Sequence, residues 1–187
     1  MDSTVASNAL FSMPAFQMIG KKAAKEKFAI LLVGPANLCA SLRDEILNVN
    51  HENHHYQMNI HMCELVEDVI KSSQQCHADF IAFLIDPSDN SAVEMVERSI
   101  SVLGPLYLCS RLCLINCYDV TPLETDAEQI HNLVDKFSVL IMHGDLANAG
   151  ARNFLAQRII YLSSSVCGFK TGLPLVFDLP SSKIVSS

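Results

Sequence analysis

The chain lacks the basic surplus that is usual in proteins that bind a nucleic-acid backbone. Of its 187 residues, 13 are Lys or Arg and 20 are Asp or Glu, which gives a formal net charge of −7. Proteins that hold phosphate backbones usually carry excess Lys and Arg. The chain also has no apolar run near the roughly 18 residues of a membrane-spanning helix. Direct nucleic-acid binding is therefore disfavoured, and no membrane partner is expected.

Paired cysteine motifs are also missing. The chain has seven cysteines but no C-x-x-C. Most of them lie in apolar runs, where cysteine behaves as a small hydrophobe. An odd number of such cysteines favours a reducing compartment, the cytosol or the nucleus. Residues 1–27 lack the basic start of a signal peptide. We expect them to form a mobile N-terminal tail.

The chain is rich in apolar residues, and segments with a strand pattern alternate along it with segments that have a helix pattern. Hydrophobic residues make up 50% of it. Strands are expected at 28–33, 56–62, 79–85, 112–115 and 139–142, the second of them near a sheet edge because it alternates apolar and polar residues. Helices are expected at 38–47, 64–75, 91–103, 121–137 and 151–166. This alternation predicts an α/β fold with a mostly parallel sheet covered by helices on both faces. We expect one domain over 28–180, followed by a Ser-rich end at 181–187.

The turn after the first expected strand has the frame of a phosphate loop. The loop reads G-x-x-x-x-G-K-[ST] in nucleotide-binding proteins. Here Gly34 fills the first glycine position and Ser41 the last. Cys39 stands in place of the second glycine, and its side chain would crowd the approach of phosphate oxygens. Ala40 replaces the lysine that reaches the phosphates. The site is predicted to be degenerate, and no cofactor is expected.

A second partial match follows the strand at 112–115. Small GTP-binding proteins carry N-K-x-D there, and Asn116 and Asp119 fit while Cys117 does not. Asn and Asp are also common in turns for local reasons. The chain has no D-x-x-G, and residues 48–56 contain no threonine for a magnesium switch. The magnesium side of a GTP site is therefore missing as well.

The histidines allow two further hypotheses. Two of His51, His54 and His55 could meet on one helix face and hold zinc, but no nearby Cys or carboxylate completes a standard spacing. A polar loop over 48–55 is the favoured interpretation. His143 precedes Gly144-Asp145 at a strand end, yet no G-x-S-x-G accompanies it. A turn is favoured there over a catalytic pair.

Several stretches together carry a family resemblance. They are residues 30–34, 79–85, 107–114, and 144–146 leading into 156–160. In their order and spacing, the chain resembles the centromere protein M family from about residue 28 to residue 179. That family is similar in fold to small GTPases but does not bind or hydrolyse nucleotide. Asn116 and Asp119 are more GTPase-like than expected for it.

This resemblance implies a non-enzymatic scaffold of the inner kinetochore, located in the nucleus at the centromere. It implies a complex with centromere proteins H, I and K, with the helical-repeat protein I as the main contact, and a requirement in kinetochore assembly and chromosome segregation. Two alternatives stay open. One is an atypical GTP-binding protein with weak or residual nucleotide binding. The other is an α/β enzyme that uses a cysteine or His143.

Two apolar stretches are surplus to the expected core and are candidates for the partner surface, since large exposed apolar patches mark interfaces. They are Tyr107, Leu108 and Cys109, and Leu175, Val176 and Phe177. The second stretch has an alternative role, which is to pack back onto the sheet.

Overall fold

The computed structural model describes residues 27–54, 56–71, 78–86, 88–108, 110–117 and 124–169. The strands are β1 (Lys27–Val33), β2 (Gln57–Cys63), β3 (Phe80–Ile85), β4 (Leu112–Asn116) and β5 (Leu140–His143). The helices are α1 (Ala36–Asn53), α2 (Val66–Lys71), α3 (Ala92–Ser101), α4 (Pro105–Leu108), α5 (Glu124–Phe137) and α6 (Ala149–Val166).

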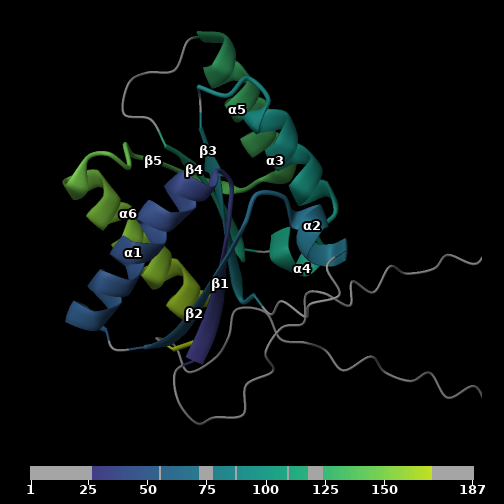
Figure 1. Ribbon diagram of the computed structural model, residues 1–187. Coiled ribbons are helices and arrows are strands. Elements are labelled where there is room, and N and C mark those ends of the chain that lie inside the picture. Colours follow the sequence, from purple (N-terminus) through teal and green to yellow (C-terminus); the bar gives the residue numbers. More distant parts are fainter. Residues whose placement is uncertain are drawn as a thin grey trace, which may run out of the picture.

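The five strands form one parallel sheet in the order β2-β1-β3-β4-β5. Helices α1 and α6 cover one face, and α2 to α5 lie on the other (Figure 1). The predicted α/β fold is confirmed, and the arrangement is consistent with a small-GTPase-like domain. The strand order reverses between β1 and β3, and such switch points are where open parallel sheets bind ligands.

Strand β1 shows why the central strands are apolar throughout. Phe28, Ile30 and Leu32 pack toward α1 and α6, whereas Leu31 and Val33 pack toward α2 and α3. A strand buried on both faces has no position for a polar side chain. The alternating strand β2 lies at the sheet edge, as predicted, with Met58 and Ile60 as its core-facing residues.

The prediction of a polar loop over 48–55 is wrong for most of that segment. Helix α1 continues to Asn53 because Val49 extends its buried stripe beyond Ile46. The side chain of Asn50 then fixes the exit from the helix. It donates to the backbone oxygen of Tyr56 and accepts from the backbone N–H of Tyr56, both at 3.0 Å.

The expected helix over 64–75 is observed as α2, and residues 72–77 lie outside the described residues. The expected tail at 1–27 lies outside them except for Lys27, and the Ser-rich end at 181–187 lies wholly outside. No helix in the described part of the chain has both the length and the apolar character needed to cross a membrane.

A buried polar cluster ties β1, β3 and β4 together at their amino ends. The Asp79 carboxylate accepts from the backbone N–H of Ala29 at 3.0 Å. The Arg111 guanidinium donates to the backbone oxygen of Asp79 at 3.3 Å, and the Tyr107 hydroxyl donates to the backbone oxygen of Ala78 at 3.1 Å. The prediction that Tyr107 is surplus to the core is therefore wrong, since its side chain is only 4% exposed.

Candidate functional site at the carboxyl ends of the strands

Gly34 ends β1 where three strands approach one another. Its φ is +146°, and an added Cβ would lie 2.7 Å from the backbone oxygen of Leu84 in β3. Its N–H donates to the oxygen of Cys63 at the end of β2, at 3.0 Å. Only glycine suits this backbone conformation and this close approach. The sequence-based assignment of Gly34 to the turn is thus explained by packing between strands.

No open loop separates β1 from α1. The helix begins at Ala36, two residues after Gly34, with Pro35 at the N-cap position. In a phosphate loop, the residues between the glycine and the helix present backbone N–H groups to the phosphates. Here the residues that would form this loop lie in the first turn of α1, and Pro35 has no N–H to offer.

Cys39 occupies the inner side of that first turn. Its side chain is fully buried, and its thiol donates to the backbone oxygen of Gly34 at 3.5 Å. Burial, and then the nearby Glu64 carboxylate, raise the pKa of Cys39 from 9.0 to about 12. The thiol is therefore neutral and unsuited to act as a nucleophile. Ala40 and Ser41 follow it in α1, both half-buried.

Carboxylates surround this end of the sheet. Burial raises the pKa of Cys117 to about 12, with further contributions from Cys39, Asp86 and Asp145. Cys117 follows β4, Asp86 follows β3 and Asp145 follows β5. Negative charges near a phosphate site oppose the binding of an anion. Asp86 and Glu64 were not predicted as site residues, although their position just after a strand is a signal that the sequence carries.

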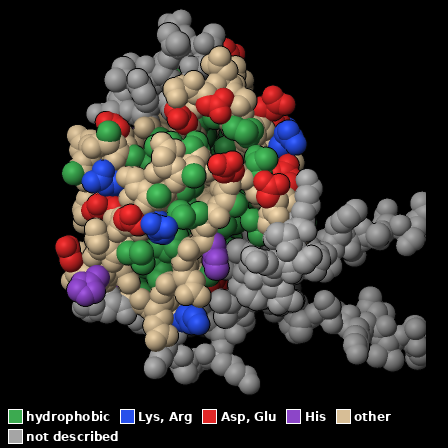
Figure 2. Space-filling model, in the orientation of Figure 1, with side chains coloured by type: hydrophobic (Ala, Val, Ile, Leu, Met, Phe, Trp, Pro, Cys, Tyr) green, Lys and Arg blue, Asp and Glu red, His purple; other side chains and the backbone are tan. Residues whose placement is uncertain are grey.

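A cavity of about 270 Å³ lies at the switch point between β1 and β3, beneath α3. Its walls are mainly apolar, with Val33, Leu84 and Val96 among them, and its polar lining includes Glu64 and Asp89. Among the described residues, no Lys or Arg lines it. Figure 2 shows acidic side chains gathered beside apolar ones on the upper part of this face. The described lining of this cavity thus offers no cation to a phosphate.

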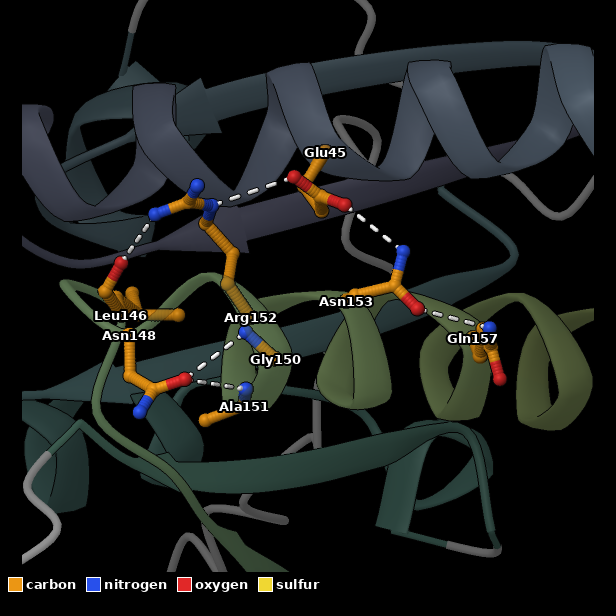
Figure 3. A network of polar contacts seen from close by, with 8 residues as sticks. All are labelled: Glu45, Leu146, Asn148, Gly150, Ala151, Arg152, Asn153 and Gln157. Carbon is orange, nitrogen blue, oxygen red and sulfur yellow. Dashed lines mark hydrogen bonds and ion pairs between the residues drawn. The ribbon is translucent and has the colours of Figure 1, made fainter.

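The polar side chains at these strand ends form hydrogen bonds with residues two or three positions further along the chain. Asp86 accepts from the N–H and hydroxyl of Ser88 at 2.9 and 2.6 Å. Asp89 accepts in the same way from Ser91, which lowers the pKa of that carboxyl. Asn148 caps α6 by accepting from two backbone N–H groups, as Figure 3 shows. These contacts stabilise turns, as is common for Asp and Asn.

The second partial motif is only half described. Asn116 ends β4 with its side chain buried, and its Oδ1 has no hydrogen-bond partner among the described residues. Cys117 is buried beside it, whereas Asp119 lies outside the described residues. His143 lies exposed at the end of edge strand β5, and the N–H of Gly144 donates to the oxygen of Asn116.

The remaining candidates are not brought together. His51 lies on α1 and His54 at its C-cap, both exposed, while His55 lies outside the described residues. Within those residues, no group of three or more His, Cys, Asp or Glu could hold a metal ion. Leu108 is half-buried and packs against the core on the side of α3 and α5. The other partner candidates, Cys109, Leu175, Val176 and Phe177, lie outside the described residues.

Comparison with protein-family models identifies the family of the chain. A family model for centromere protein M (CENP-M) matches residues 13–179. The chain belongs to the centromere protein M family. A search of curated proteins finds no significant match. Membership of the centromere protein M family confirms the resemblance inferred from the sequence and supports a role at the centromere and kinetochore.

The buried thiols of this centromere protein M domain predict a loss of stability at alkaline pH. The folded pKa values of Cys39 and Cys117 are raised to about 12. The stabilisation that these two thiols contribute is therefore fully present below pH 9, the pKa of an unfolded thiol. It is lost as the pH rises toward the folded pKa. The unfolded chain releases protons first, so stability falls by up to about 1.4 kcal/mol per pH unit for each thiol.

Urea unfolding of wild type and Cys39→Ala between about pH 8 and 11 tests this expectation. The variant should show the shallower decline, because one titrating thiol has been removed. Identical pH slopes for the two proteins would contradict the assignment of Cys39 as a buried neutral thiol.

Proposed function

We propose that this centromere protein M relative is a non-enzymatic scaffold of the inner kinetochore in the nucleus. In this proposal it binds centromere protein I, and through it stabilises a complex with centromere proteins H and K for kinetochore assembly and chromosome segregation. The observation that carries the proposal is the strand-end site. Cys39 fills it from inside, and Glu64 and Asp89 line the adjoining cavity, where the described part of the chain supplies no Lys or Arg.

The geometry supports a role in binding over one in catalysis. The buried thiols are neutral, and the carboxylates near them hold their own turns. General acid–base catalysis needs a titrating group within reach of a substrate. The alternative, weak or residual GTP binding, depends on Asn116, whose buried Oδ1 lacks a partner among the described residues. That amide alone replaces neither the lysine nor the magnesium ligands of a GTP site.

The partner surface is tested by charge substitution at Leu108 and Val176. Leu108→Glu or Val176→Glu should abolish co-elution with a fragment of centromere protein I in size-exclusion chromatography, because a buried unpaired carboxylate is costly at an apolar interface. Leu140→Glu is the matched control, since Leu140 is also a large exposed apolar residue, 49% exposed on edge strand β5.

Since Leu108 packs partly against the core, thermal unfolding must accompany the elution of that variant. A folded Leu108→Glu that no longer co-elutes supports the proposal. Co-elution of both charge variants at the wild-type level would exclude these two positions from the interface.

A further inference from the structure

A hollow of about 490 Å³ lies between the end of α1 and the middle of α6. Its lining consists of Asn53, His54, Phe154, Gln157, Arg158 and Tyr161. It lies on the sheet face covered by α1 and α6, and α4, which carries Leu108, lies on the opposite face. It is therefore separate both from the strand-end cavity and from Leu108.

The lining of this α1–α6 hollow includes two large aromatic side chains that lie outside the core. Phe154 is 53% exposed and Tyr161 is 50% exposed. With Arg158 they stand at i, i+4 and i+7 along α6, which places them on one helix face. The core-facing side of α6 is supplied by other residues, including Leu155 and Ile159, both fully buried. An exposed aromatic stripe of this kind is typical of a binding surface.

The two arginines of α6 are in contrasting situations. Arg152 lies between α1 and α6, where its Nε is 3.3 Å from Glu45 Oε2 and its Nη1 donates to the oxygen of Leu146 at 2.7 Å (Figure 3). Arg158 instead lies over the ring of Phe154, with its Cζ 5.5 Å from the ring centroid. Among the described residues Arg158 makes no ion pair. Its charge is thus held in place by a ring and is available to a partner.

Side-chain contacts hold both sides of the hollow. Glu45 on α1 accepts from Asn153 at 2.9 Å, and Asn153 accepts from Gln157 at 2.9 Å (Figure 3). Gln157 is both the end of this network and part of the wall of the hollow. On the other wall, the ring of His54 stacks on Tyr56 with centroids 5.5 Å apart. These contacts restrain side chains on both sides of the hollow, and restrained side chains lose less entropy when a partner binds.

We propose that the α1–α6 hollow binds an acidic, apolar-containing segment of a protein partner. A carboxylate would pair with the Arg158 guanidinium, and an apolar side chain would lie between Phe154 and Tyr161. Charge complementarity favours this occupant, because no Asp or Glu among the described residues lines the hollow although the chain carries a net charge of −7.

The test uses the full chain and a labelled synthetic octapeptide, Gly-Asp-Phe-Glu-Asp-Leu-Glu-Gly, in fluorescence anisotropy. The peptide should bind, and its counterpart with Asn and Gln in place of Asp and Glu should bind at least about tenfold more weakly. Arg158→Glu should weaken binding at least about tenfold, and Arg158→Lys less, because lysine keeps the charge but loses the planar fork. Phe154→Ala should weaken it several-fold.

Arg98→Glu is the matched control, because Arg98 is exposed on α3, on the other face of the sheet. The Arg98→Glu protein should bind the peptide with the affinity of the wild type. Absence of binding at about 1 mM peptide would overturn the proposal. Equal affinities of wild type and Arg158→Glu would also overturn it. If deletion of residues 170–187 increases affinity more than tenfold, the chain's own C-terminal segment competes for the hollow, and an external partner is not its occupant.

Discussion

Replacing Gly34 with alanine is expected to destabilise the domain by about 3–5 kcal/mol. The φ of +146° is a strained conformation for any residue with a Cβ. The added methyl would also lie 2.7 Å from the oxygen of Leu84 and 3.0 Å from its Cβ. Neither strand can move aside easily, because β1 is hydrogen-bonded to both β2 and β3.

Urea unfolding of Gly34→Ala and of Gly104→Ala measures this difference. Gly104 is a suitable control because a Cβ there meets nothing within 4 Å. Its substitution should change stability by no more than about 1 kcal/mol, and a gain is expected because alanine restricts the unfolded chain. A loss below about 1 kcal/mol for Gly34→Ala would contradict the close approach of β1 and β3.

Replacing Asp79 with alanine is expected to lower the free energy of unfolding by about 2 kcal/mol. The carboxylate accepts from the N–H of Ala29 inside the protein, and Asp79 and Arg111 are only 2% and 3% exposed. Without the Asp79 side chain, the buried N–H of Ala29 loses this acceptor. That loss is expensive because water does not reach the group.

Asp79→Asn should lose less free energy of unfolding than Asp79→Ala, because the amide oxygen of asparagine can still accept from the N–H of Ala29. Asp44→Ala provides a surface control, since Asp44 pairs with Arg43 at 2.7 Å with 63% of its side chain exposed. Exposed pairs of this kind contribute between about 0 and 1 kcal/mol. Thermal or urea unfolding compares the two variants. If Asp79→Ala and Asp44→Ala lost the same free energy of unfolding, the buried cluster would not be important for stability.

The central strands could be predicted from the sequence because burial on both faces leaves an uninterrupted apolar run. The end of α1 could not, since Val49 is the single buried residue in a polar stretch and the exit depends on Asn50 pairing with Tyr56. Tyr107 was misassigned because its burial depends on Ala78, 29 residues earlier. Such contacts between distant residues leave no local pattern.

The sequence was enough to predict that the candidate site lacks phosphate-loop residues. It was not enough to predict which side chains occupy the site instead. Cys39 and Ala40 could be recognised as departures from a phosphate loop by position alone. That Cys39 turns back onto Gly34, and that acids from three other strand ends lie nearby, follows only from the strand order. The α1–α6 hollow was missed because Phe154 and Tyr161 are interspersed with core residues such as Leu155 and Ile160, so the sequence gives no single apolar stripe.

The central claim is that the strand-end site has lost nucleotide binding, and thermal unfolding with and without GTP and Mg²⁺ tests it most directly. A ligand at 100 times its Kd stabilises a fold by about 2.7 kcal/mol, which for a domain of this size raises the midpoint by roughly 5–10 °C. With Mg²⁺ alone as the reference, we predict no change in the unfolding midpoint when GTP is added. A reproducible upward shift that depends on GTP would contradict the account.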